Sequence, residues 1–380
     1  MQDKERGAQT RSVYEHTRGR EHRSDAVLRF SSSIWTDSMK LLLIRNDNIG
    51  DLACTTPLFE ALRKAYPEAT IDLLGNSYNI DLVRNDPRLS RLWSYEKAKH
   101  VSGLGKKIVA LVHKAIVLCR LRNVQYDVLI IAAPVFNKRT VRLARWIRPK
   151  KIYGAATSDN HGLLPANYHP VSIDPQAPHV LQVFSYARAL GIKDPAPESM
   201  SLFLSAEEKK ASTAEKALIP GSPDLPIIGL QLSARRPKQR WSYEQWKNLI
   251  ATLLPHARLR LLWSPGSALS LQHPGDDQLA QQLAAAFSTV LAKPTTDLHS
   301  LMIAFSSCDL ILGSDGGAMH IAAALDVATV TLFGDIDPTI WQPYSKKGLF
   351  IASPTDTLAD LDPTAVAKKI IEIMNSSTYR

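Results

Sequence analysis

The stretch KLLLIRNDNIGDLACTTPLFEALRKAYPEATIDLLG, residues 40–75, decides the fold class of this chain. It opens with a continuous apolar run, KLLLIR (40–45), which is typical of parallel strands buried on both faces. The polar turn NDNIGD (46–51) follows, and LACTTPLFEALRKAY (52–66) then repeats apolar residues at helical spacing until a proline ends it. TIDLLG (70–75) is a second apolar strand. A strand, a helix and a strand in this order predict a β-α-β unit with parallel strands.

The rest of the first half repeats this alternation. The expected elements are helices over 101–121, 137–147 and 179–190 and strands over 126–133 and 151–155. A stretch rich in Pro, Asn and His, 155–200, predicts loops around the last of these helices. The pattern therefore predicts a first doubly wound domain over 39–200.

The second half follows the same logic after SLFLSAEEKK (201–210), which we interpret as a linker. Ser242 and Gln245 form the capping box of one helix. The expected strands are 226–233, 259–264, 309–314 and 328–334, and the expected helices are 242–254, 276–287, 297–308, 318–326 and 363–375. We predict a second domain over 201–355 and a C-terminal helix within 356–380.

The fold class that follows is α/β, with two Rossmann-like doubly wound domains facing each other across a cleft. Sheets of this kind bind ligands at the carboxyl ends of their strands. The polar residues 1–38 have no clear periodicity and predict a disordered extension.

Composition excludes several classes of protein. At 380 residues, with 45% hydrophobic and 22% charged residues, the chain is long enough for two globular domains and is not wholly disordered. Its three cysteines lie far apart, which predicts neither a disulfide framework nor a metal site. No apolar run reaches the roughly 20 residues of a membrane span, and the N-terminus lacks the apolar stretch of a signal peptide. These features predict a cytoplasmic protein.

The net charge of +10 is concentrated in one segment. Residues 97–151 contain fourteen Lys or Arg and one acid, Asp127. Such a patch attracts phosphates, nucleic acid or an anionic membrane surface. In the helix at 101–121 the spacing of Ile108, Val112 and other apolar residues predicts a cationic amphipathic helix that can lie at a membrane surface. The alternative is that this stripe packs on the sheet while the cations face water.

The first strand-to-helix turn, 46–51, has a single glycine, Gly50. The dinucleotide fingerprint G-x-G-x-x-G is therefore absent, and no phosphate-binding P-loop motif occurs elsewhere. Asp51 ends this turn at the expected mouth of the sheet. Its carboxylate is either a helix cap or a general base.

A second turn, SDGGAMH (314–320), has two glycines that allow the backbone to approach a ligand. The N–H groups of Gly316, Gly317 and the helix behind them predict an anion site for a diphosphate, to which His320 could donate. The alternative is a simple turn with a partly buried histidine. Asp315 suits sugar hydroxyls rather than phosphates, because a carboxylate repels anions.

The loop SARRPKQRW (233–241) carries four cations after a strand end. Lys238 and Arg240 could neutralise a leaving diphosphate without a metal, and a solvated basic loop is the alternative. No Asp-x-Asp pair or His/Cys cluster predicts a metal site.

These motifs together resemble those of the heptosyltransferase-type enzymes of glycosyltransferase family 9, which have the two-domain GT-B fold. The resemblance spans about 39–375 and rests above all on ILGSDGGAMHIAAALDVATVTLFGDIDPTIWQPY (311–344). It implies that Asp51, in the family's Ile-Gly-Asp turn with Gly50, is the base. It also implies that the turn from Asp315 to His320 holds the donor sugar and its diphosphate. Ser233 matches a small hydroxyl residue near the diphosphate only loosely.

The chain departs from the family pattern at two positions. Gly316 stands where Ser or Thr is usual, which removes a hydroxyl contact to phosphate. The family's phosphate-binding lysine lies two residues before the tryptophan, and here that position is Gln239, between Lys238 and Arg240.

The resemblance implies an inverting, metal-independent glycosyltransferase that needs no cofactor. Its expected donor is the nucleotide sugar ADP-heptose, and its expected acceptor is a lipopolysaccharide core or another anionic glycolipid at the inner face of the membrane. Nucleic acid is not an expected partner. The alternatives are another GT-B enzyme acting on nucleotide sugars, such as an epimerase, or a degenerate relative that only binds glycans.

Overall fold

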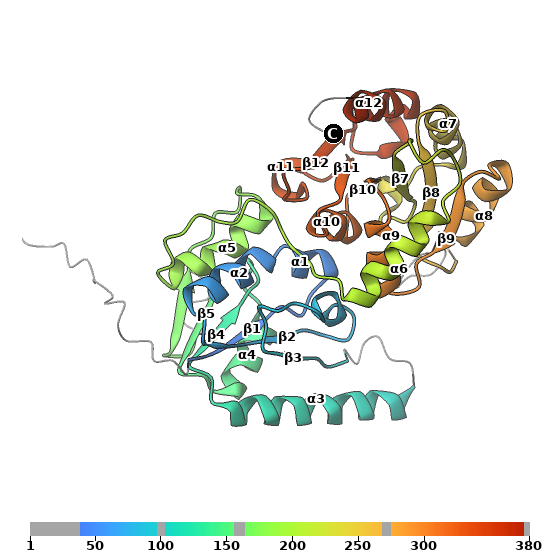
Figure 1. Cartoon of the computed structure of the whole chain (residues 1–380). Coiled ribbons are helices and arrows are strands. Elements are labelled where there is room, and N and C mark those ends of the chain that lie inside the picture. Colours follow the sequence, from blue (N-terminus) through green and yellow to red (C-terminus); the bar gives the residue numbers. More distant parts are fainter. Residues whose placement is uncertain (1–38, 97–102, 156–163, 268–274, 376–380) are drawn as a thin grey trace, which may run out of the picture. The chain divides into compact units, whose positions relative to one another are not determined.

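The computed structural model describes residues 39–96, 103–155, 164–267 and 275–375. The extension predicted at 1–38 lies outside them. Within the described residues the chain forms two six-stranded sheets flanked by helices, which confirms the prediction of two doubly wound domains (Figure 1).

The first sheet has the order β3-β2-β1-β4-β5-β6, and every neighbouring pair is parallel. Its strands are β1 (Lys40–Ile44), β2 (Thr70–Leu74), β3 (Arg91–Trp93), β4 (Val128–Ile131), β5 (Lys151–Ala155) and β6 (Tyr168–Val171). The helices of this domain are α1 (Ile49–Ala53), α2 (Thr56–Ala65), η1 (Ile80–Val83), α3 (Leu104–Val124), α4 (Lys138–Ile147) and, after the last strand, α5 (His179–Ala189). The strand β1 is central because its run of apolar residues can be buried on both faces, with Leu41 beside Ile71 on one side and Val128 on the other.

The second sheet has the order β12-β11-β10-β7-β8-β9, again all parallel. Its strands are β7 (Ile227–Gln231), β8 (Arg258–Trp263), β9 (Leu291–Pro294), β10 (Leu310–Ser314), β11 (Ala328–Phe333) and β12 (Gly348–Ala352). The helices are α6 (Ala206–Ala217), η4 (Pro237–Gln239), α7 (Tyr243–Leu253), α8 (Asp277–Ala286), α9 (Leu298–Ser306), α10 (Gly317–Ala324), α11 (Pro338–Trp341), η5 (Leu358–Asp360) and α12 (Pro363–Asn375). Counted within each domain, the strand order 3-2-1-4-5-6 is the same in both sheets.

The interpretation of 201–210 as a linker is wrong for its second half. The helix α6 begins at Ala206, because Ser205 and Glu208 form a reciprocal capping box. At the other end of the chain, α12 packs against α7 of the second domain, and Val366, Ala367 and Ile370 belong to that domain's core. The edge strands β3, β6, β9 and β12 were not expected from the sequence. Three of them, β3, β6 and β9, are short and lack a continuous apolar run, whereas β12 has one and was missed.

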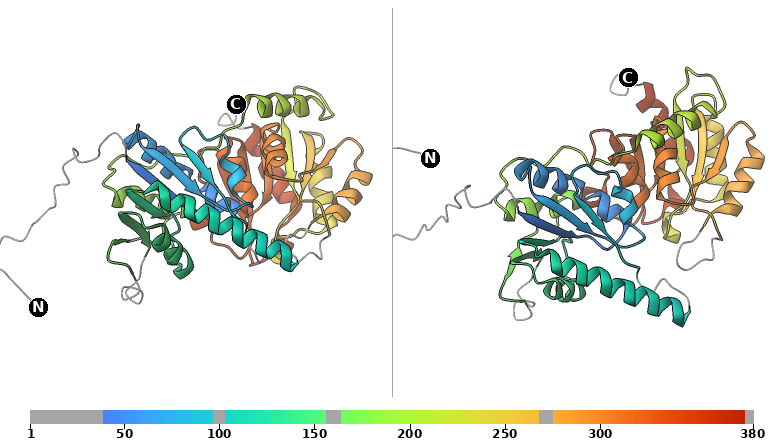
Figure 2. Two further views of the ribbon diagram at one scale, coloured as in Figure 1. Left: turned by 90° about the horizontal axis from the view of Figure 1, so that it is seen from below. Right: turned by 60° about the horizontal axis from the view of Figure 1, so that its bottom comes forward.

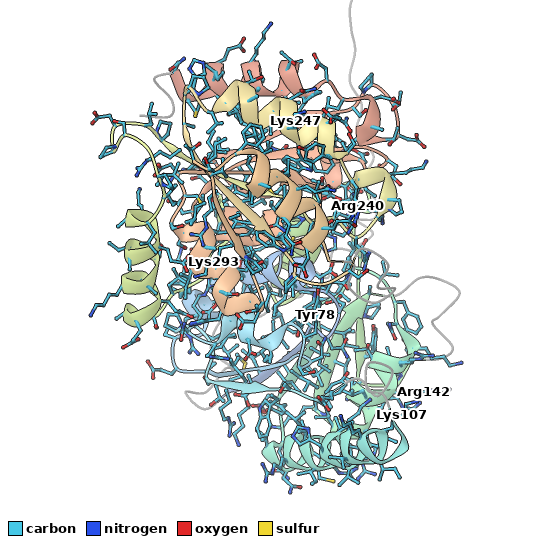
Figure 3. All side chains as sticks on the ribbon, turned by 90° about the vertical axis from the view of Figure 1, so that its right-hand side faces the viewer. Tyr78, Lys107, Arg142, Arg240, Lys247 and Lys293 are labelled. Atoms are coloured by element: carbon cyan, nitrogen blue, oxygen red, sulfur yellow. The ribbon has the colours of Figure 1, made fainter. Side chains whose placement is uncertain are left out.

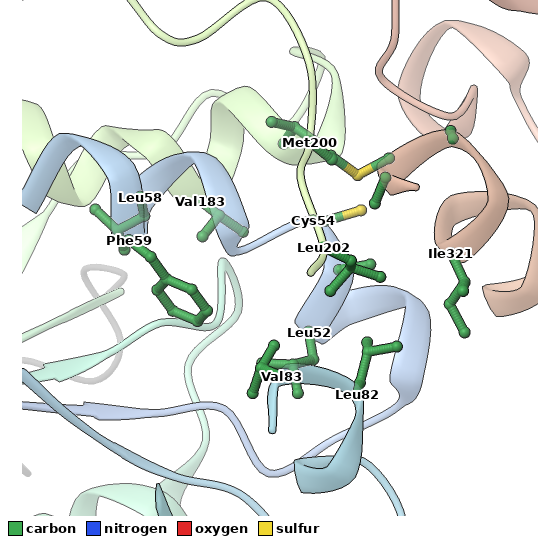
Figure 4. Packing of buried hydrophobic residues seen from close by; sticks show 14 of the residues in the cluster. Leu52, Cys54, Leu58, Phe59, Leu82, Val83, Val183, Met200, Leu202 and Ile321 are labelled. Carbon is green, nitrogen blue, oxygen red and sulfur yellow. The ribbon is translucent and has the colours of Figure 1, made fainter. Parts of the chain in front are cut away.

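The two domains share one continuous hydrophobic cluster. It runs from β1 and α1 through the connecting segment to α10, and Figure 4 shows Leu52, Met200, Leu202 and Ile321 within it. The connecting segment is also held by backbone hydrogen bonds, such as Leu202 N–H to the Ala324 carbonyl at 2.7 Å. The helices α1 and α10 are in direct contact, which brings the turn after β1 next to the turn after β10.

Two further views follow the long helix α3 along the first domain (Figure 2). None of the described helices combines the length and the apolar character that a membrane span requires.

Candidate active site

The site begins at Asp51 in the first turn of α1. Asn48 and Asp51 form a capping box, in which Asp51 Oδ2 accepts from the Asn48 backbone N–H at 3.3 Å and from its side-chain amide at 2.9 Å. One carboxylate oxygen therefore caps the helix, as one of the two sequence interpretations predicted. The other oxygen, Oδ1, points toward different partners.

Those partners are two buried side chains that the sequence analysis did not single out. Arg45, the residue after β1, donates from its NH2 group to Asp51 Oδ1 at 3.1 Å. His179, the first residue of α5, lies with Nε2 3.3 Å from the same oxygen and 3.0 Å from Arg45 NH2. With a proton on Nε2 the His179 ring donates to Asp51, whereas with a bare Nε2 it accepts from Arg45. Asp51 is thus a positioned carboxylate as well as a helix cap.

Trp341 of α11 closes this arrangement from the second domain. Its ring stacks on His179 with centroids 4.2 Å apart and an interplanar angle of 19°. It also meets the ring of His320 edge-on at 6.4 Å. One indole therefore contacts a histidine from each domain.

The charges around Asp51 keep it ionised. Burial alone raises the pKa of Asp51, but the hydrogen bond from His179 and the positive charge of Arg45 outweigh it and hold this pKa far below its usual range. The neighbouring Asp47 lies 3.2 Å from Arg45 Nε, yet burial raises its pKa. At neutral pH Asp51 is a carboxylate with low proton affinity.

A cavity of about 500 Å³ opens beside this carboxylate. That volume is within the range of small-ligand sites. Its walls come from the ends of β1 and β4, from α4 and α5, and from α11, and they include Asp47, Asp51, Phe136, His179 and Trp341.

The second predicted turn follows β10. Asp315 leads into Gly316, which occupies the N-cap of α10 without a side chain to cap the helix. Burial raises the pKa of Asp315 to about 6, although a hydrogen bond from Gln239 and the charge of Arg236 lower it. The described chain thus leaves the N-terminus of α10 without a capping side chain, next to a carboxyl group that titrates near pH 6.

The glycines of the two turns differ in what surrounds them. A Cβ atom on Gly317 would lie 2.6 Å from Ile49 Cγ1, and one on Gly50 would lie 2.9 Å from Gly317 Cα. These two glycines therefore allow α1 and α10 to approach each other, which is a packing role that the sequence did not reveal. A Cβ on Gly316, by contrast, would meet only the Ser314 carbonyl oxygen, at 3.9 Å.

His320 is buried rather than open to a ligand. Its Nδ1 lies 3.5 Å from Cys54 Sγ across the contact between α1 and α10, and the ring is 3% exposed. Burial lowers the pKa of His320 to about 4, so the ring is neutral at pH 7. The structure corresponds to the alternative interpretation of a buried histidine, and donation from His320 to a diphosphate stays a prediction.

Gln239 occupies the position at which the family has a phosphate-binding lysine. Gln239 is buried, and its side-chain amide donates to Asp315 Oδ2 at 3.1 Å. The backbone carbonyl oxygen of Gln239 accepts a hydrogen bond from Ser314 Oγ at 2.6 Å. This position therefore faces the second turn, as the resemblance implies, but with an uncharged side chain.

The flanking cations have partners elsewhere. Lys238 is paired with Asp356 on the surface. Arg240 lies 3.1 Å from Asp276, and Asp276 in turn accepts from Ser233 Oγ at 2.6 Å. Lys238, Arg240 and Ser233 are thus engaged within the protein, and their expected contact with a diphosphate stays a prediction. Arg236 is the loop cation whose charge acts on Asp315.

Among the described residues, no group of three or more His, Cys, Asp or Glu side chains is arranged to hold a metal ion.

Comparisons with known proteins give the family of this chain. The family model for glycosyltransferase family 9 (heptosyltransferase) matches residues 117–371. Lipooligosaccharide heptosyltransferase 2 of Haemophilus ducreyi is 24% identical over 328 residues, which cover 82% of this chain and 88% of that protein. Lipopolysaccharide heptosyltransferase 1 of Escherichia coli is 27% identical over 136 residues, which span only 36% of this chain and 40% of that enzyme.

A solved structure of E. coli heptosyltransferase WaaC with ADP-2-deoxy-2-fluoro heptose has the same fold. It superposes with a TM-score of 0.68 at 19% identity, over 88% of this chain and all of that one. The fold, the two facing turns and the family match lead to one conclusion: this chain belongs to glycosyltransferase family 9, the heptosyltransferase family.

Proposed function

We propose that this protein transfers a heptose from ADP-heptose to a lipopolysaccharide core or a related anionic glycolipid, with inversion at the anomeric carbon and without a metal ion. Full-length relatives are heptosyltransferases that act on lipopolysaccharide or lipooligosaccharide, and a structural neighbour carries an ADP-heptose analogue. The acceptor would be met at the inner face of the membrane, by a cytoplasmic enzyme bound peripherally.

One observation carries this proposal. The contact between α1 and α10 places a carboxylate and an uncapped helix N-terminus on adjacent turns. A glycosyl transfer needs a proton acceptor for the incoming hydroxyl and a stabiliser of negative charge for the leaving diphosphate. The two turns supply one of these each.

The reaction is a single displacement. An acceptor hydroxyl in the cavity beside Asp51 attacks the anomeric carbon from the face opposite the diphosphate. The new oxygen–carbon bond forms as the bond between the anomeric carbon and the diphosphate oxygen breaks. The electron pair of the broken bond leaves with ADP. The N–H groups at the start of α10 face the charge that develops on the diphosphate.

The low pKa of Asp51 sets the timing of proton transfer. A carboxylate with such a low proton affinity does not deprotonate a free hydroxyl to any useful extent. The same carboxylate accepts the proton readily once the attacking oxygen has bonded to carbon and become acidic. Arg45 and His179 hold Asp51 Oδ1 in place and are positioning residues in this scheme.

The test is a transfer assay with ADP-heptose and a core acceptor that lacks heptose. We expect release of ADP and an acceptor whose mass rises by one heptose, with inverted anomeric configuration by NMR. Activity should persist in excess EDTA, because the helix terminus and the basic residues replace a cation. Loss of activity on chelation that Mg²⁺ or Mn²⁺ restores would overturn the metal-independent mechanism.

A thermal-shift screen of nucleotide sugars separates the alternatives, since a ligand that binds only the native state raises its Tm. A different stabilising donor that is transferred or epimerised would identify another GT-B enzyme. Stabilisation by the core acceptor, with no turnover of any donor, would identify a protein that only binds glycans.

A further inference from the structure

The helix α3 packs on the first domain along a narrow face. Ala110, Val117 and Leu121 are buried, and Val117 and Leu121 join the core cluster on that side of the sheet. These residues recur after seven and four positions, so they share one face of the helix. Every other residue of the helix from Gly105 to Val124 is exposed or only partly buried.

The opposite face is apolar and faces away from the protein. Five aliphatic residues between 45% and 67% exposed lie on this helix: Ile108, Val109, Leu111, Val112 and Ile116. At 100° per residue, Ile108, Val112, Ile116 and the exposed Cys119 cluster opposite the buried face. The prediction of an apolar stripe was right, but the alternative that it packs on the sheet is wrong. An exposed aliphatic surface of this kind marks an interaction site.

Cations border this apolar face on both sides. Lys106 and Arg120 are fourteen residues apart and lie along one border, while Lys107 and Lys114 are seven apart and lie along the other. Neither α3 nor α4, which packs against it, contains an acidic residue. The helix α4 adds the exposed Arg142, which is labelled together with Lys107 in Figure 3. Long basic side chains beside an apolar face can reach phosphates while the face is buried.

We propose that the outer face of α3, meaning Ile108, Val109, Leu111, Val112, Ile116 and Cys119, inserts into the headgroup region of an anionic lipid bilayer. An aliphatic face bordered by cations is complementary to acyl chains beneath negative headgroups. A second copy of the chain would place like-charged borders against each other, and a nucleic acid offers nothing to the aliphatic side chains. The proposal rests on α3 alone and does not depend on the proposed sugar transfer.

Vesicle flotation at low salt tests the binding. We expect the protein to bind vesicles that contain phosphatidylglycerol and to dissociate from them at high salt. Vesicles of pure phosphatidylcholine should not bind the protein. Lys106→Gln/Lys107→Gln/Arg120→Gln should weaken binding roughly 100-fold, since each cation near an anionic surface contributes about fivefold. The matched control Lys209→Gln/Lys210→Gln/Lys368→Gln removes the same charge from exposed sites in the second domain and should bind like wild type. Equal binding by the two triple variants would overturn the proposal.

The apolar contribution separates insertion from simple charge attraction. Ile108→Gln/Val112→Gln/Ile116→Gln keeps every cation and should still lose at least tenfold in binding, because aliphatic burial scales with area. An unchanged Tm checks that each variant is folded. Vesicle binding unaffected by this variant would contradict insertion.

Cys119 offers a direct probe, because it is exposed while Cys54 and Cys308 are buried. An environment-sensitive fluorophore on Cys119 should shift to the blue with anionic vesicles and be quenched by spin-labelled lipid. In the variant Cys119→Ser/Lys210→Cys the same dye is attached at position 210 of the second domain. There it should show neither the blue shift nor the quenching. Vesicle binding without a blue shift at Cys119 would overturn the proposal, and so would a micromolar dimer that the apolar triple variant abolishes.

Discussion

The turn after β1 and the turn after β10 both follow a central strand, the first strand of one sheet and the fourth of the other, yet they are built for opposite tasks. Each follows one of the two central strands that flank the point where the strand order reverses, which is where doubly wound sheets bind ligands. The contact between α1 and α10 brings the two turns together. Their shared position comes from the fold, and their difference comes from a few side chains.

The first turn neutralises its charge internally. Asp51 is held by Arg45, His179 and Asn48, so its negative charge is stabilised and its pKa is lowered. The second turn does the reverse. Asp315 has a raised pKa, and the helix end beside it has no capping side chain. The partners of Asp51 keep that carboxylate in place, whereas the start of α10, which lacks a capping side chain, is available to a ligand.

The strongest test of the comparison is Asp51→Asn. If the first turn supplies the base, turnover should fall by about 10²–10⁴ while ADP binding stays near the wild-type value. Steady-state kinetics and calorimetric titration with ADP measure the two effects.

Asp47→Asn is the matched control for this experiment. Asp47 also lies against Arg45, so the substitution disturbs the same ion-pair network without touching the expected base. We expect a smaller loss of turnover than in Asp51→Asn. An equal or larger loss would move the role of the base to Asp47.

The raised pKa of Asp315 in the second turn should be measurable in the pH dependence of protein stability. The pKa of Asp315 is raised from 3.8 to about 6 in the folded protein, so folding binds a proton between these values. The stabilising contribution of Asp315 is therefore lost as the pH rises from 4 to 6, and it amounts to about 2 to 3 kcal/mol at 1.36 kcal/mol per pKa unit. Asp315→Asn lacks this group and keeps an acceptor for Gln239.

The measurement is denaturant unfolding of both proteins at pH 4 and pH 8. The stability of Asp315→Asn relative to wild type should increase by about 2 to 3 kcal/mol between these pH values. An equal pH dependence in the two proteins would mean that Asp315 titrates normally.

The sequence predicted the fold because its strands and helices differ in period. The run at 40–45 and the glycine turn at 314–320 have local signatures, so Asp51, Asp315 and Gly316 could be named in advance. His179 and Trp341 could not, because each lies over 120 residues from Asp51 along the chain and their stacking depends on the packing of two domains. The stripe on α3 shows a related limit. Periodicity defines an apolar face but not whether that face points inward, and this helix has apolar residues on both sides.

His179→Phe tests whether the first turn depends on a residue that sequence motifs did not indicate. Phenylalanine keeps an aromatic ring against Trp341 but removes the nitrogen near Asp51. Because the hydrogen bond from His179 lowers the pKa of Asp51, the pKa should rise in the variant and the acid limb of the kcat/KM profile should move to higher pH. We expect turnover to fall about tenfold, the cost of one charge-assisted hydrogen bond. An unmoved acid limb would show that the ring only packs.

The smallest expected effect belongs to Gly316→Ser, which makes the second turn more like that of its family. The backbone of Gly316 is extended, with φ 162°, and the nearest neighbour of an added Cβ would be 3.9 Å away, so serine fits without strain. If the start of α10 binds the diphosphate, the new hydroxyl adds one hydrogen bond and should tighten ADP binding about two- to tenfold. Gly316→Ala adds the carbon without the hydroxyl and should leave the Kd unchanged. Calorimetric titration distinguishes the two variants, and equal affinities in both would mean that the diphosphate does not reach this side of the turn.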